Sequence, residues 1–175
     1  MRVERAFAFV DLSGFTGFTH RNGDESARQV LTGFRTVLRS VVDHHGIRVG
    51  KWLGDGAMIV SVDLAALVSA VVELHARMRE VSGALPIRSG VTVGKVIVFE
   101  GDDYIGSTVN LAARLCDQAA DDEILAHAAI VERMGDQVVA EPLGRRVIRG
   151  FDEPVDIVRV VACRVPESEA VARQR

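Results

Sequence analysis

The sequence predicts an α+β fold, a ferredoxin-like βαββαβ core sandwich with additional C-terminal strands. Strand and helix patterns follow in the order strand, helix, hairpin, helix, strand, helix, with short strands after them. The hairpin requires neighbouring antiparallel strands, and 175 residues amount to about one domain. We assign residues 1–163 to this domain and residues 164–175 to a polar tail, and we expect the helices to cover one face of the sheet.

The first half of the chain contains a strand, a helix and a hairpin. Residues 5–11 (RAFAFVD) form a short apolar run that ends in an aspartate, which indicates a buried strand. Apolar residues spaced by three and four predict an amphipathic helix over residues 24–42. Residues 47–53 and 57–62 are strand-like, and the Gly-Asp-Gly segment between them predicts a hairpin with an Asp-Gly tight turn.

The second half begins with a helix, since Asp63 is suited to cap a helix that runs to about Val81. Residues 87–99 alternate and are rich in β-branched side chains, which predicts a strand that continues through an irregularity at Gly94. After a polar turn, the remaining expected elements are a helix over residues 107–119 and short strands near residues 137–141 and 155–162.

Composition matches an ordinary soluble globular protein, with 48% hydrophobic and 26% charged residues. The formal net charge of -3 argues against binding nucleic acid through a broad basic field. Cys116 and Cys163 lack the spacing of a zinc site or a disulfide framework, so we expect a reducing, cytoplasmic location. The N-terminal apolar run is too short for a signal segment or a membrane span, and we expect no membrane partner.

Two acidic residues, Asp11 and Asp55, lie at the ends of strands that neighbour each other in the expected sheet. Both carboxylates are therefore expected to reach one edge of the sheet together. Such a pair suits Mg²⁺, which prefers oxygen ligands and takes one or two protein carboxylates together with substrate phosphates. Two alternatives remain open, namely that Asp55 is only a turn residue and that Asp11 caps the following helix.

The segment after Asp11 turns into a helix and so presents free backbone N–H groups at the same edge of the sheet. Together with a metal, these groups would form a cradle for a triphosphate. The residues of this predicted cradle are Ser13, Gly14, Phe15 and Thr16. An aspartate at a strand end is also typical of a receiver domain, but the predicted hairpin argues against the parallel sheet of that fold.

A second polar cluster lies in the segment GDDYIGSTVNLAARL, residues 101–115. Asn110 and Arg114 are four residues apart on the expected helix, so they share one face. With Asp103 seven residues earlier, they are suited to bind the phosphates, ribose and base of a nucleotide. The alternative is that Asn110 bonds locally and that Arg114 forms a surface ion pair.

Five segments occur in fixed order along the chain: FAFVDLSGFTGFTHRNGDESA, KWLGDGAMIV, RSGVTVGKV, GDDYIGSTVNLAARL and PLGRRVIRGFDEPVDIVRV. Together they resemble the catalytic domain of class III nucleotidyl cyclases. The resemblance spans roughly residues 5–162, and several motifs at fixed spacing make it specific. It implies an enzyme that forms a cyclic nucleotide and pyrophosphate from a nucleoside triphosphate.

The resemblance also implies roles for individual residues. Asp11 and Asp55 match the two metal-binding aspartates and would hold two Mg²⁺ or Mn²⁺ ions, with help from the backbone carbonyl of Leu12. Lys51 and Asp103 match the purine-selecting pair of adenylate cyclases, whereas guanylate cyclases of the family usually carry glutamate and cysteine there. The substrate implied is therefore ATP.

The chemistry of adenine agrees with this pair. A lysine at position 51 can donate to the ring N1, and an aspartate at position 103 can accept from the N6 amine. Guanine presents the opposite pattern at both atoms and would leave both groups unpaired. Of the remaining positions, Asn110 matches the ribose-orienting asparagine, and Arg114 matches the arginine that stabilises charge on the phosphates.

The resemblance further implies a dimer. Lys51 and Asp55 lie on one hairpin and cannot easily reach opposite ends of one nucleotide. In the family the active site forms between two catalytic domains, so a chain that carries both sets of residues is expected to form a head-to-tail homodimer with two equivalent sites. The resemblance does not identify a regulatory domain or a regulatory protein. The alternatives are a catalytically silent nucleotide-binding or dimerisation module of the same fold, and a guanylate cyclase.

Two features of the central segment have structural interpretations that we favour. His44 and His45 could bind a metal, but a histidine near a helix C-terminus is explained by the helix dipole. Trp52 could lie under an adenine, but an apolar side chain in a strand is expected in the core.

Overall fold

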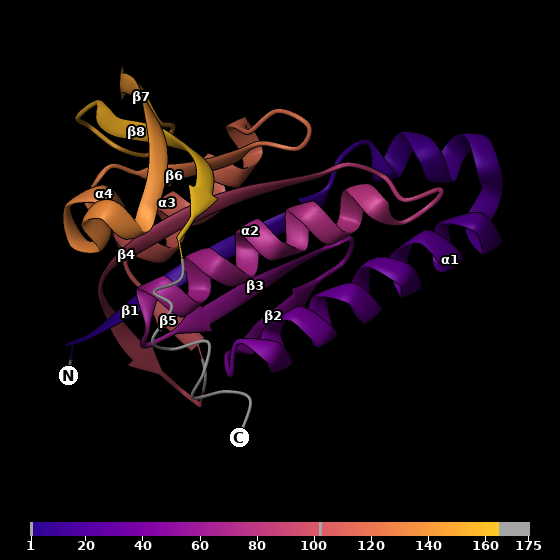
Figure 1. Ribbon diagram of the computed structural model, residues 1–175, viewed down its shortest axis with the longest axis horizontal. Coiled ribbons are helices and arrows are strands. Elements are labelled where there is room, and N and C mark those ends of the chain that lie inside the picture. The colour runs from indigo at the N-terminus through magenta and orange to yellow at the C-terminus, as the bar shows by residue number, and fades with distance from the viewer. Residues whose placement is uncertain (1, 102, 165–175) are drawn as a thin grey trace.

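The computed structural model describes residues 2–101 and 103–164, and Figure 1 shows how its elements are arranged. Residues 165–175 of the predicted polar tail lie outside the described residues. The elements are β1 (Arg2–Leu12), α1 (Phe15–His44), β2 (Arg48–Leu53), β3 (Gly56–Ser61), α2 (Leu64–Glu80), β4 (Ile87–Phe99), β5 (Asp103–Ile105), α3 (Ser107–Gln118), β6 (Ile124–His127), α4 (Ala129–Met134), a 3₁₀ turn (Gly135–Gln137), β7 (Val138–Arg146) and β8 (Val155–Cys163).

In the described part of the chain, eight strands form one sheet in the order β2-β3-β1-β4-β6-β8-β7, with β5 paired to β4. The four strands β2-β3-β1-β4 pair antiparallel, and α1 and α2 connect them as a ferredoxin-like core requires. The strands β6, β8 and β7 extend this core beyond β4, where β6 pairs parallel to β4. The predicted fold class is confirmed.

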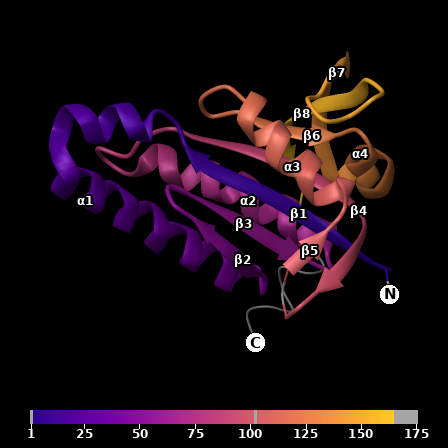
Figure 2. The same ribbon diagram turned by 180° about the vertical axis from the view of Figure 1, so that it is seen from behind.

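Helices lie on both faces of the sheet. Alternate residues of β1 point to opposite sides, and each side is buried against helices. Ala6, Ala8 and Val10 are buried with apolar residues of α1 and α2. Phe7 is buried on the other side with Val109 of α3. Accordingly, α1 and α2 lie in front of the sheet in Figure 1, and α3 lies in front of it in the reversed view of Figure 2. The expectation that the helices cover one face is wrong for α3.

The first helix is longer than predicted. It begins at Phe15 rather than near residue 24, and Gly23 interrupts it with φ 82° and ψ 168°. The predicted amphipathic helix corresponds to the part after this kink, and the turns before it are too polar to show a helical period. Although α1 spans 30 residues, neither it nor any other described helix is long and apolar enough to cross a membrane.

The predicted hairpin forms from β2 and β3, but with a different turn. Leu53 pairs with Gly56, so the two turn residues are Gly54 and Asp55. Gly54 has φ +62°, which agrees with a type II′ turn that has glycine at its first central position. Asp55 therefore lies at the tip of the hairpin, and Gly56 is the first residue of β3.

The strand β4 has the predicted bounds but lacks the predicted irregularity. Gly94 pairs with Arg5 in an uninterrupted register. The glycines of β4 instead allow α3 to approach closely. A Cβ atom at Gly94 would lie 2.6 Å from the Thr108 hydroxyl, and one at Gly90 would overlap the backbone of α3 at Ala112. Close packing on β4 thereby fixes the position of α3, which carries Asn110 and Arg114.

Sequence patterns missed three short elements and underestimated one strand. The elements β5, β6 and α4 contain three, four and six residues, which is too short for a periodic signal. Asp103 was expected in a polar turn but is the first residue of β5. The strand β7 runs to Arg146, well beyond the predicted end at residue 141.

A buried histidine predicts how stability depends on pH. His75 of α2 is 2% exposed, and its Nε2 lies 2.8 Å from the Ser89 hydroxyl. Burial, with a smaller contribution from the charge of Arg79, lowers the pKa of His75 to about 4. An unfolded histidine titrates near pH 6.5, so between these values the unfolded state binds more protons. This group's stabilising contribution is present above pH 6.5 and is lost as the pH falls toward 4.

We expect the free energy of unfolding to fall by about 2 kcal/mol between pH 7 and pH 5 because of this one group. Urea unfolding of the wild type and of His75→Gln at both pH values measures it, and the variant should show the smaller fall. Equal falls in both proteins would contradict the assignment, whatever the absolute stability of the variant.

Candidate active site

Asp11 and Asp55 lie side by side at one end of the sheet. Asp11 is near the end of β1 and pairs with Gly56 of β3, while the Leu12 N–H donates to the Asp55 carbonyl at 3.2 Å. A Cβ atom at Gly56 would lie 2.7 Å from the Val10 carbonyl and 3.0 Å from Asp11 Oδ1. Glycine is therefore required at the position that follows Asp55. The predicted convergence of the two carboxylates agrees with this geometry.

Sequence reasoning gave no role to Arg88, which lies opposite Asp11 in the register of β4 with β1. Its Nη2 and Nε donate to Asp11 Oδ2 at 2.8 and 3.2 Å, and its Nη1 donates to the Asp117 carbonyl at 3.1 Å. Arg88 therefore orients the Asp11 carboxylate and ties it to the end of α3. No pattern in the sequence signals this contact, because it depends on the register that makes residues 11 and 88 neighbours.

The electrostatics at Asp11 favour a cation. Burial raises the pKa of Asp11 above its ordinary value, hydrogen bonds from Arg88 oppose this rise, and the negative charge of Asp55 adds to it. A divalent cation between the carboxylates would relieve their repulsion, and oxygen ligands are those that Mg²⁺ takes. The residues present therefore fit the predicted metal site. The role of the Leu12 carbonyl stays a prediction.

The predicted phosphate cradle lies where β1 leads into α1. Gly14 is the N-cap, with φ +70° and no side-chain hydrogen bond to the helix, so the first N–H groups of α1, those of Phe15 and Thr16 among them, lack a side-chain cap. The Ser13 N–H already donates to the Pro86 carbonyl at 2.8 Å, which removes it from the set of free donors. The Ser13 hydroxyl is buried and has no partner within the described residues.

The predicted purine-selecting residues lie in direct contact. Lys51 Nζ of β2 lies 3.0 Å from Asp103 Oδ1 of β5. The two side chains are 57% and 59% exposed, and ion pairs this exposed contribute little to stability. The ion pair can therefore break at little cost, and each group can bind a ligand in place of the other. The neighbouring Trp52 packs with the α1/α2 core under the guanidinium groups of Arg35 and Arg39, as its structural interpretation predicted.

Asn110 and Arg114 lie on the exposed side of α3, whose opposite side is buried against the sheet. Arg114 Nη1 lies 3.4 Å from Asp117 Oδ2, a contact within one helical turn. In the part of the chain that the structure describes, no hydrogen bond or ion pair joins Asp11 or Asp55 directly to either residue. Apart from the phosphate cradle at the start of α1, the predicted site residues thus form three groups, a carboxylate pair, a Lys-Asp pair and an exposed face of α3.

Comparison with sequences of known proteins gives partial matches. No protein-family model matches the chain. An uncharacterized protein of Mycobacterium tuberculosis is 37% identical over 153 residues, which cover 87% of this chain and 40% of that protein. An adenylate cyclase of Streptomyces coelicolor is 32% identical over 129 residues, which cover 74% of this chain and 34% of that protein. The chain therefore spans less than half the length of these relatives.

Comparison with solved structures covers nearly the whole chain. The adenylyl cyclase CyaB from P. aeruginosa superposes with a TM-score of 0.83 at 25% identity, over 94% of this chain and 96% of that chain. The guanylyl cyclase Cya2 superposes with a TM-score of 0.83 at 25% identity, over 95% of this chain and 96% of that chain. At these coverages the match extends beyond the ferredoxin-like core.

Proposed function

Because the chain belongs to the class III nucleotidyl cyclase family, as its fold and relatives show, we propose that it is an adenylate cyclase that converts ATP to 3′,5′-cyclic AMP and pyrophosphate. The chain resembles an adenylyl and a guanylyl cyclase equally well, so the nucleotide must be argued from the site. The observation that carries the assignment is the contact between Lys51 and Asp103, at 3.0 Å. One donor and one acceptor held together match the N1 and N6 atoms of adenine.

In the proposed reaction the ribose 3′-hydroxyl attacks the α-phosphate, the bond to the β-phosphate breaks, and pyrophosphate leaves. Two Mg²⁺ or Mn²⁺ ions, held by Asp11, Asp55 and the Leu12 carbonyl, would lower the pKa of the attacking hydroxyl and clamp the triphosphate. The N-terminus of α1 binds the phosphates through its free N–H groups. On α3, Asn110 orients the ribose and Arg114 stabilises the charge that develops on the phosphates.

We infer that the working unit is a head-to-tail homodimer. One chain supplies the carboxylate pair, and the other supplies the Lys-Asp pair and the exposed face of α3. Large apolar side chains remain exposed on the hairpin of β4 and β5, and a contiguous patch of this kind marks an interaction surface. Its members are Ile97, Phe99 and Ile105, which are 39%, 49% and 52% exposed and share one face of the hairpin, since Ile97 pairs with Ile105 and strand residues alternate.

The direct test is a product assay with the purified protein across a range of protein concentrations. We expect cyclic AMP from Mg-ATP and Mn-ATP, with specific activity that rises with concentration until the dimer is saturated. Nucleotide binding without turnover at any concentration would favour the catalytically silent module instead. A preference for GTP would favour the guanylate cyclase.

Exchange of the purine-selecting pair tests the choice of nucleotide. The variant Lys51→Glu/Asp103→Cys should lose activity with ATP and gain activity with GTP, since glutamate accepts from the protonated N1 of guanine and the pair no longer matches adenine. We expect the ratio of kcat/KM for ATP to that for GTP to fall by at least about a hundredfold, which corresponds to about 2.7 kcal/mol of discrimination. An unchanged ratio would show that other residues select the base.

A further inference from the structure

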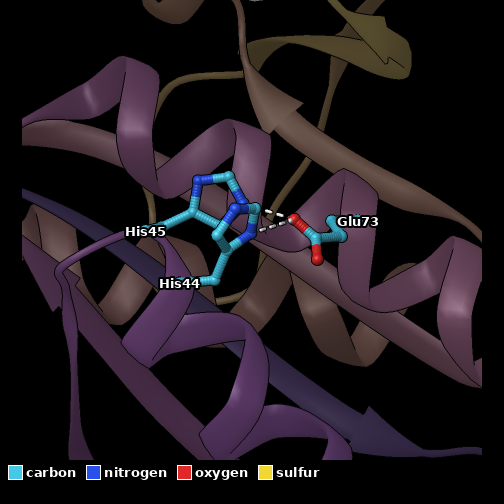
Figure 3. Close-up of side chains that lie close together, drawn as sticks. All are labelled: His44, His45 and Glu73. Atoms are coloured by element: carbon cyan, nitrogen blue, oxygen red, sulfur yellow. Dashed lines mark hydrogen bonds and ion pairs between the residues drawn. The ribbon is translucent and has the colours of Figure 1, made fainter. Parts of the chain in front are cut away.

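A second group of potential metal ligands lies between α1 and α2, away from the residues assigned to the nucleotide. His44 is the last residue of α1, His45 follows it as the C-cap, and Glu73 belongs to the middle of α2 (Figure 3). The three side chains point toward one another, and both histidine rings face the same carboxylate oxygen. Among residues 2–101 and 103–164, this is the one group of three His, Cys, Asp or Glu side chains with ligand atoms this close together.

The distances within this group are close to those of a metal site. Glu73 Oε2 lies 3.1 Å from His44 Nδ1 and 2.6 Å from His45 Nε2, and all three ligand atoms lie within 4.8 Å of one another. Ligand atoms of a tetrahedral zinc ion lie about 3.3 Å apart, because each Zn–N or Zn–O distance is about 2.0–2.2 Å. Small rotations of the side chains would bring the three atoms to this spacing.

Neighbouring residues hold the carboxylate in place. Arg77 Nη2 lies 2.5 Å from Glu73 Oε1, and Arg77 Nη1 donates to the Ser40 hydroxyl at 3.1 Å. Arg77 therefore occupies the outer oxygen of Glu73 and leaves Oε2 to face the two histidines. An outer hydrogen bond of this kind orients a metal-ligating carboxylate. The side chain of His45 is only 7% exposed, whereas that of His44 is 59% exposed, so one side of the group is open to solvent.

We propose that His44, His45 and Glu73 form a binding site for a divalent transition metal of the zinc class. Two imidazoles and one carboxylate favour zinc over magnesium, which prefers a full set of oxygen ligands. Three protein ligands leave a fourth position for water or another ligand. The metal ties the end of α1 to α2 directly before β2, the strand that carries Lys51. The site is separate from the carboxylate pair that would hold the catalytic ions.

Calorimetric titration of the 175-residue chain with ZnCl₂, in buffer that contains saturating MgCl₂, tests the proposal. Excess magnesium competes with zinc at the carboxylate pair, and the loss of zinc binding in variants of the histidine group identifies the binding that remains. We expect one zinc ion per chain, and an affinity that falls by more than about tenfold in each of His44→Asn, His45→Asn and Glu73→Gln. The matched controls His20→Asn and Glu80→Gln, exposed residues of the same two helices, should bind zinc as the wild type does.

A second measurement guards against variants that merely unfold. At a zinc concentration a hundredfold above the dissociation constant, the thermal midpoint of the wild type should rise by about 5–10 °C, and that of His44→Asn should rise much less. His44 is the most exposed of the three ligands, so its replacement disturbs the fold least. Zinc binding that is absent in the wild type, or unchanged in His44→Asn and Glu73→Gln, would overturn the proposal. Neither readout depends on cyclase activity, so this test and that of the proposed function fail separately.

Discussion

Replacement of Asp55 by asparagine should lower the rate of cyclic AMP formation by at least about a thousandfold. The substitution keeps the shape of the side chain but removes the charge that would hold a metal ion beside Asp11. A metal ion contributes several kcal/mol to a phosphoryl-transfer transition state, and each 1.36 kcal/mol corresponds to a factor of ten in rate. The measurement is kcat at saturating Mn-ATP, with folding checked by circular dichroism.

Asp55 is a cleaner test than Asp11. Within the described residues Asp55 forms no ion pair, whereas Asp11 accepts two hydrogen bonds from Arg88. Asparagine at position 11 would therefore also disturb Arg88 and the end of α3. The matched control is Asp136→Asn, an exposed aspartate of the 3₁₀ turn, which should leave kcat unchanged. Retention of more than a tenth of the activity in Asp55→Asn would exclude Asp55 as an essential metal ligand.

Local patterns in the sequence were sufficient for the core of the fold. Strand β4 has the bounds that its alternation predicted, and Asp63 caps α2 by accepting from the Ala66 N–H at 3.1 Å. These features depend on residues close together in the chain. The face on which α3 packs was not predictable in the same way, because it depends on Gly90 and Gly94 meeting a helix some twenty residues later.

In the candidate site, too, contacts that follow from expected strand pairing were predictable, whereas contacts between distant residues were not. The neighbourhood of Asp11 and Asp55 follows from the expected pairing of their strands, and the contact of Lys51 with Asp103 agrees with a pairing that only the family resemblance implied. Arg88 and Glu73 were missed, because each meets its partners across a large sequence separation. Arg88 lies 77 residues from Asp11, and no local pattern encodes the register that brings them together.

Two inactive variants, mixed in equal amounts, should recover activity if the site forms between two chains. Asp55→Asn lacks a metal ligand, and Arg114→Ala lacks the charge that stabilises the phosphates on the other side of the site. In a heterodimer one of the two sites combines both defects, and the other has every residue intact. Random pairing makes half of the dimers heterodimers, and each heterodimer has one intact site out of its two. A quarter of all sites are then intact, so we expect about a quarter of the wild-type activity.

The complementation separates a shared site from one built within a single chain. If Asp55 and Arg114 of the same chain acted together, both chains of every mixed dimer would remain defective, and the mixture would show only the average of the two weak activities.

The control is a mixture of Asp11→Asn with Asp55→Asn, whose defects fall on the same half of the site. In that mixture every site lacks one of the two carboxylates, so activity should stay at the background level at any ratio. The exposed apolar hairpin of β4 and β5 supplies a surface on which the two chains can meet, and dilution of the active mixture should abolish its recovered activity.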